Sequence, residues 1–333
     1  MADHIWSTYL AAASGDHDAA MAALNAAVAS NDAITFDAEA TPNVNLDLSG
    51  LDDVTVNVDA NITFDSADVD WANVGMALNN AETVYGWGVI FQDGGSNLTL
   101  NFAPGVYIDV DQHEDLPMTT AAVAALGGLR QAHAAIWIRD SDNFTGRNLW
   151  ARNMNGVLFL ARCDNCDIDG LKATDPDSRR VEIQSQAFCL GFEGRMRGAI
   201  VKNLYAVGVN EAVDVQSGCQ DIVVDGAYIE NCHGDGFDVA TQCKDIAFRN
   251  CEWLNSNGAN IKQELFNSNY GDEDDGGITY EQAGIAIEGT ARFTDNSVGS
   301  NVAKGHWIRI IGQEVHEDLH IDVTIVNSAN NNL

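Results

Sequence analysis

A pattern of residues occurs twice in succession in this chain, 24 residues apart, and this period restricts the fold more than any other feature. The segment Val213-Asp214-Val215 recurs as Phe237-Asp238-Val239, and Cys219 recurs as Cys243. A second landmark is an Asn or Gly followed by an apolar residue, at intervals of 22, 33, 23 and 24, at Asn148, Gly170, Asn203, Gly226 and Asn250. Repeats of this length indicate a stacked array in which each unit buries its apolar face against its neighbours.

Within one repeat, apolar and polar residues alternate over three to five positions, as in Phe237-Asp238-Val239. Such alternation is typical of β-strands. Three short strands with turns at Gly, Asn and Asp account for about 22–24 residues, at ~3.3 Å per strand residue. The Leu-rich frame of a leucine-rich repeat is missing. The sequence therefore predicts an all-β protein, a single-stranded solenoid with about 22–24 residues per coil.

The segments SGCQDIVVDGAYIENC (217–232) and ATQCKDIAFRNCEWLNSNG (240–258) resemble stacked coils of the right-handed parallel β-helix superfamily. That superfamily includes pectate-lyase-like and polygalacturonase-like enzymes and viral tailspikes. The resemblance covers roughly Ala33 to Val326 and implies a right-handed parallel β-helix. It leaves the function open, because many unrelated activities use this scaffold.

Residues 1–32 are predicted to form an N-terminal cap. This segment is Ala-rich, carries apolar Met21 and Leu24, and has a helix start signal at Ser14-Gly15-Asp16. A short helix there would cover the open end of the β-helix and its unpaired strand edges, although docking on a partner is an alternative. Residues 33–333 are predicted to form the β-helix domain, with loop excursions near 71–87, 112–133, 174–184 and 270–282.

The chain is strongly acidic, with 49 acidic against 17 basic residues and a formal net charge of -32. The acids comprise 35 Asp and are scattered along the sequence, whereas only 5 residues are Lys. Self-repulsion of this kind is largely screened at molar salt, where the Debye length is ~3 Å. The composition resembles that of proteins from salt-adapted archaea and their viruses; an ordinary acidic protein is the alternative. We expect no nucleic-acid partner, because nucleic-acid binding depends on basic patches.

Seven cysteines, an odd number, disfavour a disulfide framework. Cys219 and Cys243 are expected on neighbouring coils ~4.8 Å apart, where a bridge is possible but a ladder of buried thiols is the preferred interpretation. No apolar run reaches membrane-spanning length, and the first residues lack the features of a secretory signal. We therefore expect neither membrane insertion nor export by that route.

Basic residues gather in one part of the chain, because seven of the 17 fall between Arg162 and Lys202. A guanidinium fork matches the carboxylate or sulfate groups of a glycan. The predicted ligand-binding set for a host surface glycan or glycoprotein is Arg179, Arg180, Arg195 and Arg197. Ordinary ion pairs with nearby acids are the alternative.

Two pairs of carboxylates are spaced by one period. If Val213 and Val215 point inward, Asp214 points outward with Asp238 above it, and Glu211 and Asp235 are likewise 24 residues apart. Charges ~5 Å apart repel by ~3 kcal/mol at an effective dielectric of 20, so one carboxyl of a pair can keep a proton. Glycoside hydrolysis uses such an acid and base. The candidate catalytic residues are therefore Glu211, Asp214, Asp235 and Asp238, with a solvated or cation-bridged ladder as the alternative.

The segments VNEAVDV and HGDGFDV resemble the Asn-Thr-Asp and Asp-Asp blocks of polygalacturonases, which places Glu211 and Asp235 at two carboxylate positions. The chain departs from that family at three points. The first Asp of the paired block is Gly234, the catalytic His of the next coil is Ala259, and the Arg-Ile-Lys substrate motif is absent. These departures favour binding over catalysis.

An acidic loop precedes Gly276-Gly277 and contains Asp272, Asp274 and Asp275. Calcium favours several carboxylates on a flexible loop, so these residues are a candidate calcium site, with a hydrated loop as the alternative. The predicted function requires no cofactor.

Together these features favour a virion-associated attachment protein, of the tailspike, fibre or capsid-surface kind, that binds a host surface glycan beside other virion proteins. Such a protein would be made in the host cytoplasm. A homo-oligomer, most simply a trimer, is expected because solenoid spikes often associate in this way. The alternative is a polysaccharide hydrolase or lyase that uses the outward carboxylates, and a third interpretation is a purely structural virion component.

Overall fold

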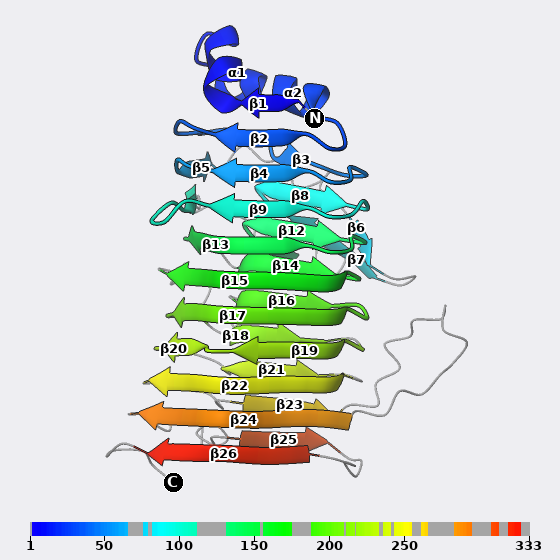
Figure 1. Ribbon diagram of the computed structural model, residues 1–333, viewed down its shortest axis with the longest axis vertical. Helices are drawn as coiled ribbons and strands as arrows, with labels where there is room; N and C mark the ends of the chain where they lie inside the picture. Colours follow the sequence, from blue (N-terminus) through cyan, green and yellow to red (C-terminus); the bar gives the residue numbers. More distant parts are fainter. Residues whose placement is uncertain are drawn as a thin grey trace, which may run out of the picture.

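The computed structural model describes residues 2–65, 76–78, 82–111, 131–153, 156–174, 188–209, 211–216, 218–232, 236–240, 243–254, 261–265, 283–294, 308–312 and 319–327. These residues form a right-handed parallel β-helix in which coil lies on coil along one long axis (Figure 1). The predicted fold class is thereby confirmed.

Two long sheets run the length of the β-helix, and their described strands pair in parallel. The main path of the first sheet, sheet A, contains β1 (Asp3–Ile5), β2 (Ala33–Phe36), β4 (Thr55–Val58), β9 (Thr99–Phe102), β13 (Thr145–Arg152), β15 (Asp164–Thr174), β17 (Arg197–Val207), β19 (Gln220–Asp225), β22 (Lys244–Leu254), β24 (Ala283–Thr294) and β26 (Leu319–Asn327). Three short strands also pair with it, namely β5 (Ile62–Asp65), β10 (Ile108–Asp111) and β20 (Tyr228–Glu230).

The second sheet, sheet B, contains β3 (Leu46–Asp47), β8 (Ile90–Asp93), β12 (Ile136–Arg139), β14 (Gly156–Ala161), β16 (Phe188–Glu193), β18 (Glu211–Val215), β21 (Phe237–Ala240), β23 (Ile261–Leu265) and β25 (Ile308–Gly312). A separate small sheet is formed by β6 (Met76–Leu78), β7 (Glu82–Trp87) and β11 (Gln131–His133). It falls within two of the predicted excursions, near 71–87 and 112–133. The other residues of those excursions lie outside the described residues, as do 175–184 and the whole excursion near 270–282.

The Asn or Gly landmark of the sequence takes a left-handed backbone conformation in sheet A, within a long strand at four positions and between β19 and β20 at Gly226. All five landmark residues have a positive φ, between 52° and 80°. Gly and Asn tolerate this left-handed conformation better than other residues. The Asn203 amide donates to Asp169 Oδ1 at 2.7 Å, and the Asn250 amide donates to Asp225 Oδ1 at 2.8 Å. Backbone geometry therefore explains why the landmark recurs once per coil.

Inward-facing side chains of both sheets fill a continuous apolar core. In the central coils, Phe237 stacks on Phe248 at 4.2 Å and meets Trp253 edge to face at 5.3 Å, all three being buried. All seven cysteines are buried free thiols. Burial raises the pKa of the Cys163 thiol to about 12, which keeps this thiol protonated.

The N-terminal cap consists of two short helices, α1 (Trp6–Ala12) and α2 (His17–Ala27), where one was predicted. The second begins at the predicted place, because Asp16 accepts a hydrogen bond from the Ala19 N–H at 3.0 Å. The first was missed, since it is only seven residues long and has no side-chain cap. Both helices lie across the end of the stack beyond β2 (Figure 1). Neither is long and apolar enough to cross a membrane, and the same holds for the rest of the described chain.

Asp32 connects the N-terminal strand to the first coil through hydrogen bonds. Its Oδ1 accepts a hydrogen bond from the Ala2 N–H at 2.6 Å, and its Oδ2 accepts one from the Ala29 N–H at 3.1 Å and lies 3.1 Å from His4 Nε2. The bond from Ala2, with the contact to His4, lowers the pKa of Asp32 from 3.8 to about 2. The carboxylate is therefore the form that the folded protein stabilises.

We expect Asp32→Asn to lower the melting temperature at neutral pH, because the amide loses charge-assisted acceptors. A carboxyl whose pKa is lower in the folded state adds stability above its unfolded value of 3.8, and this stability is lost as the pH falls through about 2. The difference between wild type and variant, followed by circular dichroism, should be full above pH 3.8 and should close near pH 2. The control is Asp59→Asn, because Asp59 is exposed. A difference in melting temperature that does not depend on pH, or an equal difference in the control variant, would contradict this account.

Candidate active site

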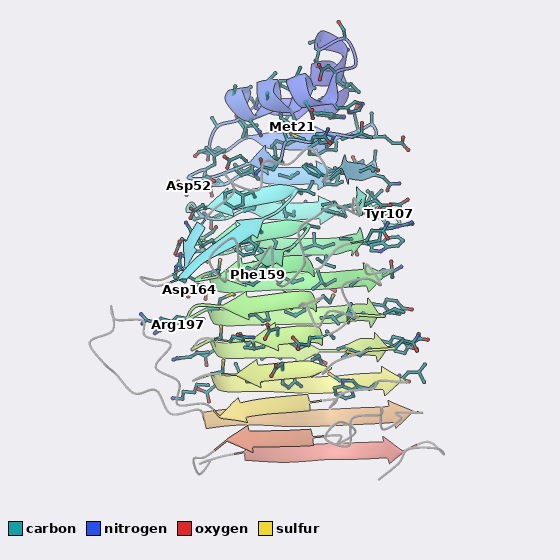
Figure 2. The ribbon with its side chains drawn as sticks, turned by 180° about the vertical axis from the view of Figure 1, so that it is seen from behind. Met21, Asp52, Tyr107, Phe159, Asp164 and Arg197 are labelled. Atoms are coloured by element: carbon teal, nitrogen blue, oxygen red, sulfur yellow. The ribbon has the colours of Figure 1, made fainter. Side chains whose placement is uncertain are left out.

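One column of residues on the outer face of sheet B leads to the candidate site. Successive register partners in this column are Trp137, Phe159, Gly191, Asp214 and Asp238. The two aromatic rings stack at 4.1 Å and are buried outside the main core (Figure 2 labels Phe159). The column thus changes from aromatic to acidic at Gly191, which has no side chain.

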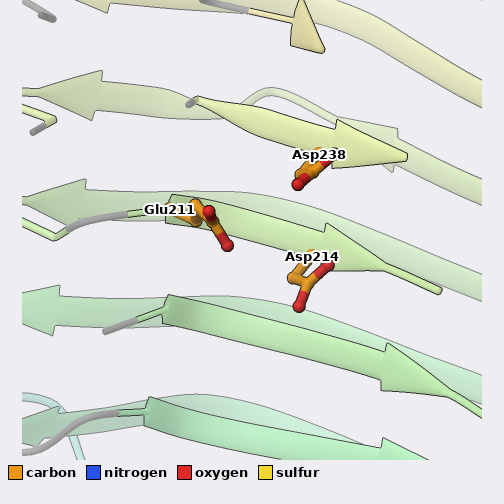
Figure 3. A group of neighbouring side chains, drawn as sticks. All are labelled: Glu211, Asp214 and Asp238. Carbon is orange, nitrogen blue, oxygen red and sulfur yellow. The ribbon is translucent and has the colours of Figure 1, made fainter. Parts of the chain in front are cut away.

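Three carboxyl groups meet at the acidic part of this column. Oxygen atoms of Glu211, Asp214 and Asp238 all lie within 4.8 Å of one another (Figure 3). Val213 and Val215 belong to the core, so the intervening Asp214 faces outward, as the alternation predicted. It is nevertheless buried: Asp214 is 7% exposed and Asp238 is 4% exposed, whereas Glu211 is half-buried.

An irregularity at the start of β18 brings Glu211 to the same side as Asp214, three positions later. The N–H groups of Ala212 and Val213 both donate to the carbonyl oxygen of Gly236, at 2.9 and 3.1 Å. A β-bulge forms where two residues of one strand lie opposite a single residue of the neighbouring strand, as Ala212 and Val213 do here. Strict alternation would put Glu211 and Asp214 on opposite faces, and the bulge removes one step of that alternation. The cluster therefore depends on a local feature that the 24-residue period does not contain.

The electrostatics of this cluster favour shared protons. Two unit charges 4.8 Å apart repel by about 3.5 kcal/mol at an effective dielectric of 20, and burial adds a penalty for each charge. Three neighbouring carboxylates would incur this repulsion three times, so proximity and burial both favour proton sharing within the cluster.

Sequence reasoning missed one residue of this site. The side-chain nitrogen of Gln216 lies 2.7 Å from Oδ1 and 2.9 Å from Oδ2 of Asp214. Gln216 falls outside the repeated pattern, because the residue 24 positions later is Ala240. Its place two residues after Asp214, on the same strand face, was the available signal.

The other predicted site residues are not part of this cluster. Arg195 is half-buried with a φ of 66°, and the exposed Arg197 begins β17 next to its register partner Asp164 (Figure 2). Arg195 precedes β17 of sheet A and Arg197 is its first residue, whereas the three carboxylates belong to sheet B. The remaining predicted residues lie outside the described residues: Asp235, Arg179, Arg180, Asp272, Asp274 and Asp275.

A metal ion is a chemical alternative for the cluster. Within the described part of the chain, Glu211, Asp214 and Asp238 form the group of acidic residues that could supply ligands to one ion. Hard cations such as calcium favour oxygen ligands of this kind. The Gln216 side chain directs N–H donors at Asp214, which satisfies both oxygens of that carboxylate without a cation.

The fold places this chain among the right-handed parallel β-helix proteins, whose solved members include pectate-lyase-like and polygalacturonase structures. It resembles the polygalacturonase from Erwinia carotovora ssp. carotovora with a TM-score of 0.53 and 13% identity, over 91% of this chain and 92% of that one. It also resembles a 1,3-alpha-1,4-beta-D-galactose-4-sulfate-3,6-anhydro-D-galactose-2-sulfate 4 galactohydrolase, with a TM-score of 0.54 and 12% identity over 87% and 71% of the two chains.

A third similar structure is the surface protein and adhesin PfbA of Streptococcus pneumoniae, with a TM-score of 0.53 and 12% identity over 99% and 86% of the two chains. At such identities the likeness shows the fold alone. No protein-family model and no curated protein sequence matches this chain.

Proposed function

We propose that this protein hydrolyses a polysaccharide at the cluster of Glu211, Asp214 and Asp238. The main support is that oxygen atoms of these three carboxyl groups lie within 4.8 Å of one another on the outer face of a β-helix, and that two of the three residues are buried. Two of the solved structures with a similar fold are named as enzymes that hydrolyse polysaccharides, which supports the hydrolase alternative over attachment alone.

The cluster supplies the two groups that glycoside hydrolysis needs. Carboxyl groups this close correspond to the double displacement of retaining enzymes. An ionised carboxylate forms a bond to the anomeric carbon as the bond from that carbon to the glycosidic oxygen breaks, and a protonated carboxyl donates its proton to that oxygen. Water then attacks the anomeric carbon, the bond to the carboxylate breaks, and the water's proton passes to the carboxylate that gave up its own, so one water is consumed and both carboxyls return to their starting state.

The proposal does not depend on the polygalacturonase motifs, which are incomplete in this chain. Gly234 and Ala259 replace an Asp and a His of that family, and both lie outside the described residues. Asp214 and Asp238 are carboxylates at other positions of the same two coils. They give the chain two candidate catalytic carboxyl groups of its own.

The direct test incubates the purified protein with a panel of acidic and neutral polysaccharides and reads the products by mass spectrometry. Molar salt in the buffer screens the protein's charge of -32. We expect shortened chains from the wild type and none from a double variant, Asp214→Asn with Asp238→Asn. Intact polysaccharides throughout the panel, with retained binding, would exclude the hydrolase and favour attachment.

A glycan-binding attachment protein is the second candidate, because the exposed Arg197 offers a guanidinium at the start of β17 in sheet A. The similar fold of an adhesin is compatible with this function. If Arg197 binds an acidic sugar, Arg197→Ala should weaken glycan binding by roughly tenfold in co-sedimentation, as expected for one lost charge-assisted contact. Equal binding by variant and wild type would remove Arg197 from the ligand site. The placement on a virion and the trimer remain predictions.

A further inference from the structure

We propose that a row of side chains on the outer face of sheet A binds an uncharged linear polysaccharide through the faces of its sugar rings. This aromatic row consists of Tyr107, Trp150, Lys172, Tyr205 and Tyr228. It belongs to sheet A, whereas the carboxylate cluster belongs to sheet B, so it is a second binding surface. The choice of a polysaccharide as the ligand rests on the proposed function, but binding can be measured without cleavage.

Strand pairing arranges the aromatic row along the axis of the β-helix. Trp150, Lys172 and Tyr205 are successive register partners, and Tyr205 pairs in turn with Tyr228. Tyr107 directly precedes β10 and contacts the Trp150 ring edge to face at 5.0 Å. Figure 2 shows Tyr107 at the outer edge of the stack. Paired strands lie ~4.8 Å apart, so the row repeats at about the length of one sugar unit in an extended chain.

The rings of the row remain accessible although they contact one another. Tyr205 stacks on Tyr228 with centroids 5.2 Å apart, yet 38% of Tyr205 is exposed. Tyr107, Trp150 and Tyr228 are half-buried. A sugar ring carries C–H groups on its faces and hydroxyl groups at its edges, and Tyr and Trp offer a large apolar surface to such faces. The exposed parts of these rings therefore suit a sugar chain.

Lys172 in the middle of the row is held by the rings on either side. Its Nζ lies 3.7 Å from the centroid of the Trp150 ring and 5.6 Å from that of Tyr205. No carboxylate of the described residues forms an ion pair with Lys172, although the chain contains 49 acidic residues. Its N–H donors are therefore available to the hydroxyl oxygens of a sugar.

Hydrogen bonds fix two of the rings before any ligand binds. The Trp150 indole N–H donates to Thr174 Oγ1 at 3.0 Å, and the Tyr228 hydroxyl donates to Glu230 Oε2 at 3.2 Å. Binding loses less conformational entropy when the contacting side chains are already ordered. The row is thus organised for a ligand in advance.

The aromatic row is one residue wide, which favours a linear polymer over a protein partner. On one side it is bordered by the Asn and Gly landmark, two positions before the row residues on the strands. On the other side, two positions later, the residues are polar or charged apart from Val207: Arg152, Thr174 and Glu230. A stable protein interface buries about 800 Å² on each partner, which is broader than such a strip. The net charge of -32 disfavours a polyanion, so we infer an uncharged polymer.

The test measures retention of the full chain on beads that carry xylan, galactan or fully methyl-esterified polygalacturonate. We expect retention on at least one of these neutral polymers, at molar as at low salt, because salt does not screen stacking. Tyr205→Ala should weaken this binding by roughly tenfold. Ile200→Ala is the matched control, since Ile200 lies on the same strand and is 46% exposed, and it should bind like the wild type. Tyr205→Leu, which lacks a ring but stays apolar, replaces Tyr205→Ala if the latter does not fold.

The inference is overturned if no neutral polymer retains the wild type, or if the folded Tyr205 variant binds as well as the wild type. It is also overturned if sedimentation velocity shows that Tyr205→Ala dissociates an oligomer and no polymer is retained, because the row is then a contact between copies of the chain. Retention only on unesterified polygalacturonate, lost at molar salt and in Lys172→Met, would assign the surface to an anion instead.

The proposed function and this inference fail separately. If a polymer is bound at the row but never cleaved, the proposed function fails and the inference stands. If cleavage occurs, Tyr205→Ala should raise KM for the polymer and leave the cleavage of short oligosaccharides unchanged, because these are too short to reach from the cluster to the row. Equal KM values for the polymer in variant and wild type, with equal retention, would leave the hydrolase without this second surface.

Discussion

Replacement of Asp238 by Asn is expected to lower the rate constant for polysaccharide cleavage by about 10²–10⁴-fold. The amide has nearly the same size as the carboxyl but can neither donate the catalytic proton nor carry the negative charge of a carboxylate. Because Asp238 is buried and belongs to the three-carboxyl cluster, the loss should appear in kcat more than in KM. Initial rates of reducing-end formation over a range of substrate concentrations measure both constants.

The matched control for this substitution is Asp245→Asn. Asp245 is exposed and has a φ of 54°, a conformation that Asn adopts readily, so the control removes a charge without strain. We expect its rate constants to equal those of the wild type. Full activity of Asp238→Asn would remove Asp238 from the catalytic set, and equal losses in the two variants would point to a general effect of charge.

Truncation of Phe237 to Ala is expected to lower the free energy of unfolding by about 3–5 kcal/mol. The ring of Phe237 is fully buried between Phe248, at 4.2 Å, and Trp253, at 5.3 Å, so its removal leaves a cavity at the centre of a coil. Denaturant unfolding followed by tryptophan fluorescence reports the change, because Trp253 borders the cavity.

Phe237→Leu is the control, since it retains most of the buried volume and should have a clearly smaller effect, about 1–2 kcal/mol. Similar effects of Ala and Leu would show that packing of the ring is unimportant. A β-helix is stabilised mainly by contacts between adjacent coils, so the damage should be largest next to β21. Since Asp238 follows Phe237 in the chain, the Ala variant should also lose activity at temperatures where its coil begins to unfold.

The stacking of the coils could be predicted because the 24-residue period of the sequence determines which residues lie side by side. The register of β18 and β21 pairs Val213 with Phe237 and Asp214 with Asp238, as the 24-residue spacing requires. The Asn and Gly landmark was equally informative, since a left-handed bend accepts few other residues. Periodic features of this kind are determined by backbone geometry and by the burial of alternate side chains.

The features that the sequence did not reveal are local departures from the period. Helix α1 is too short to give a clear amphipathic pattern, although Trp6 is fully buried within it. The bulge that joins Glu211 to the aspartates depends on two N–H groups that share the carbonyl oxygen of Gly236. Gln216 enters the site through a single side-chain contact. Helix α1 and Gln216 add no periodic apolar positions, and the bulge is visible only as two adjacent core residues, Ala212 and Val213, so the 24-residue period alone could not predict these features.

The position of the carboxylate cluster across two adjacent coils also suggests how such a site can originate. The two aspartates occupy the same place in consecutive copies of one repeat, and strands of those copies lie side by side. A tandem duplication of one coil would therefore set a copied aspartate directly against its original, with no new acidic residue required. Proton sharing would follow at once from their proximity. In a solenoid, a single duplication event can thus turn a solvent-facing aspartate into a coupled acid pair, which later substitutions can refine into a working site.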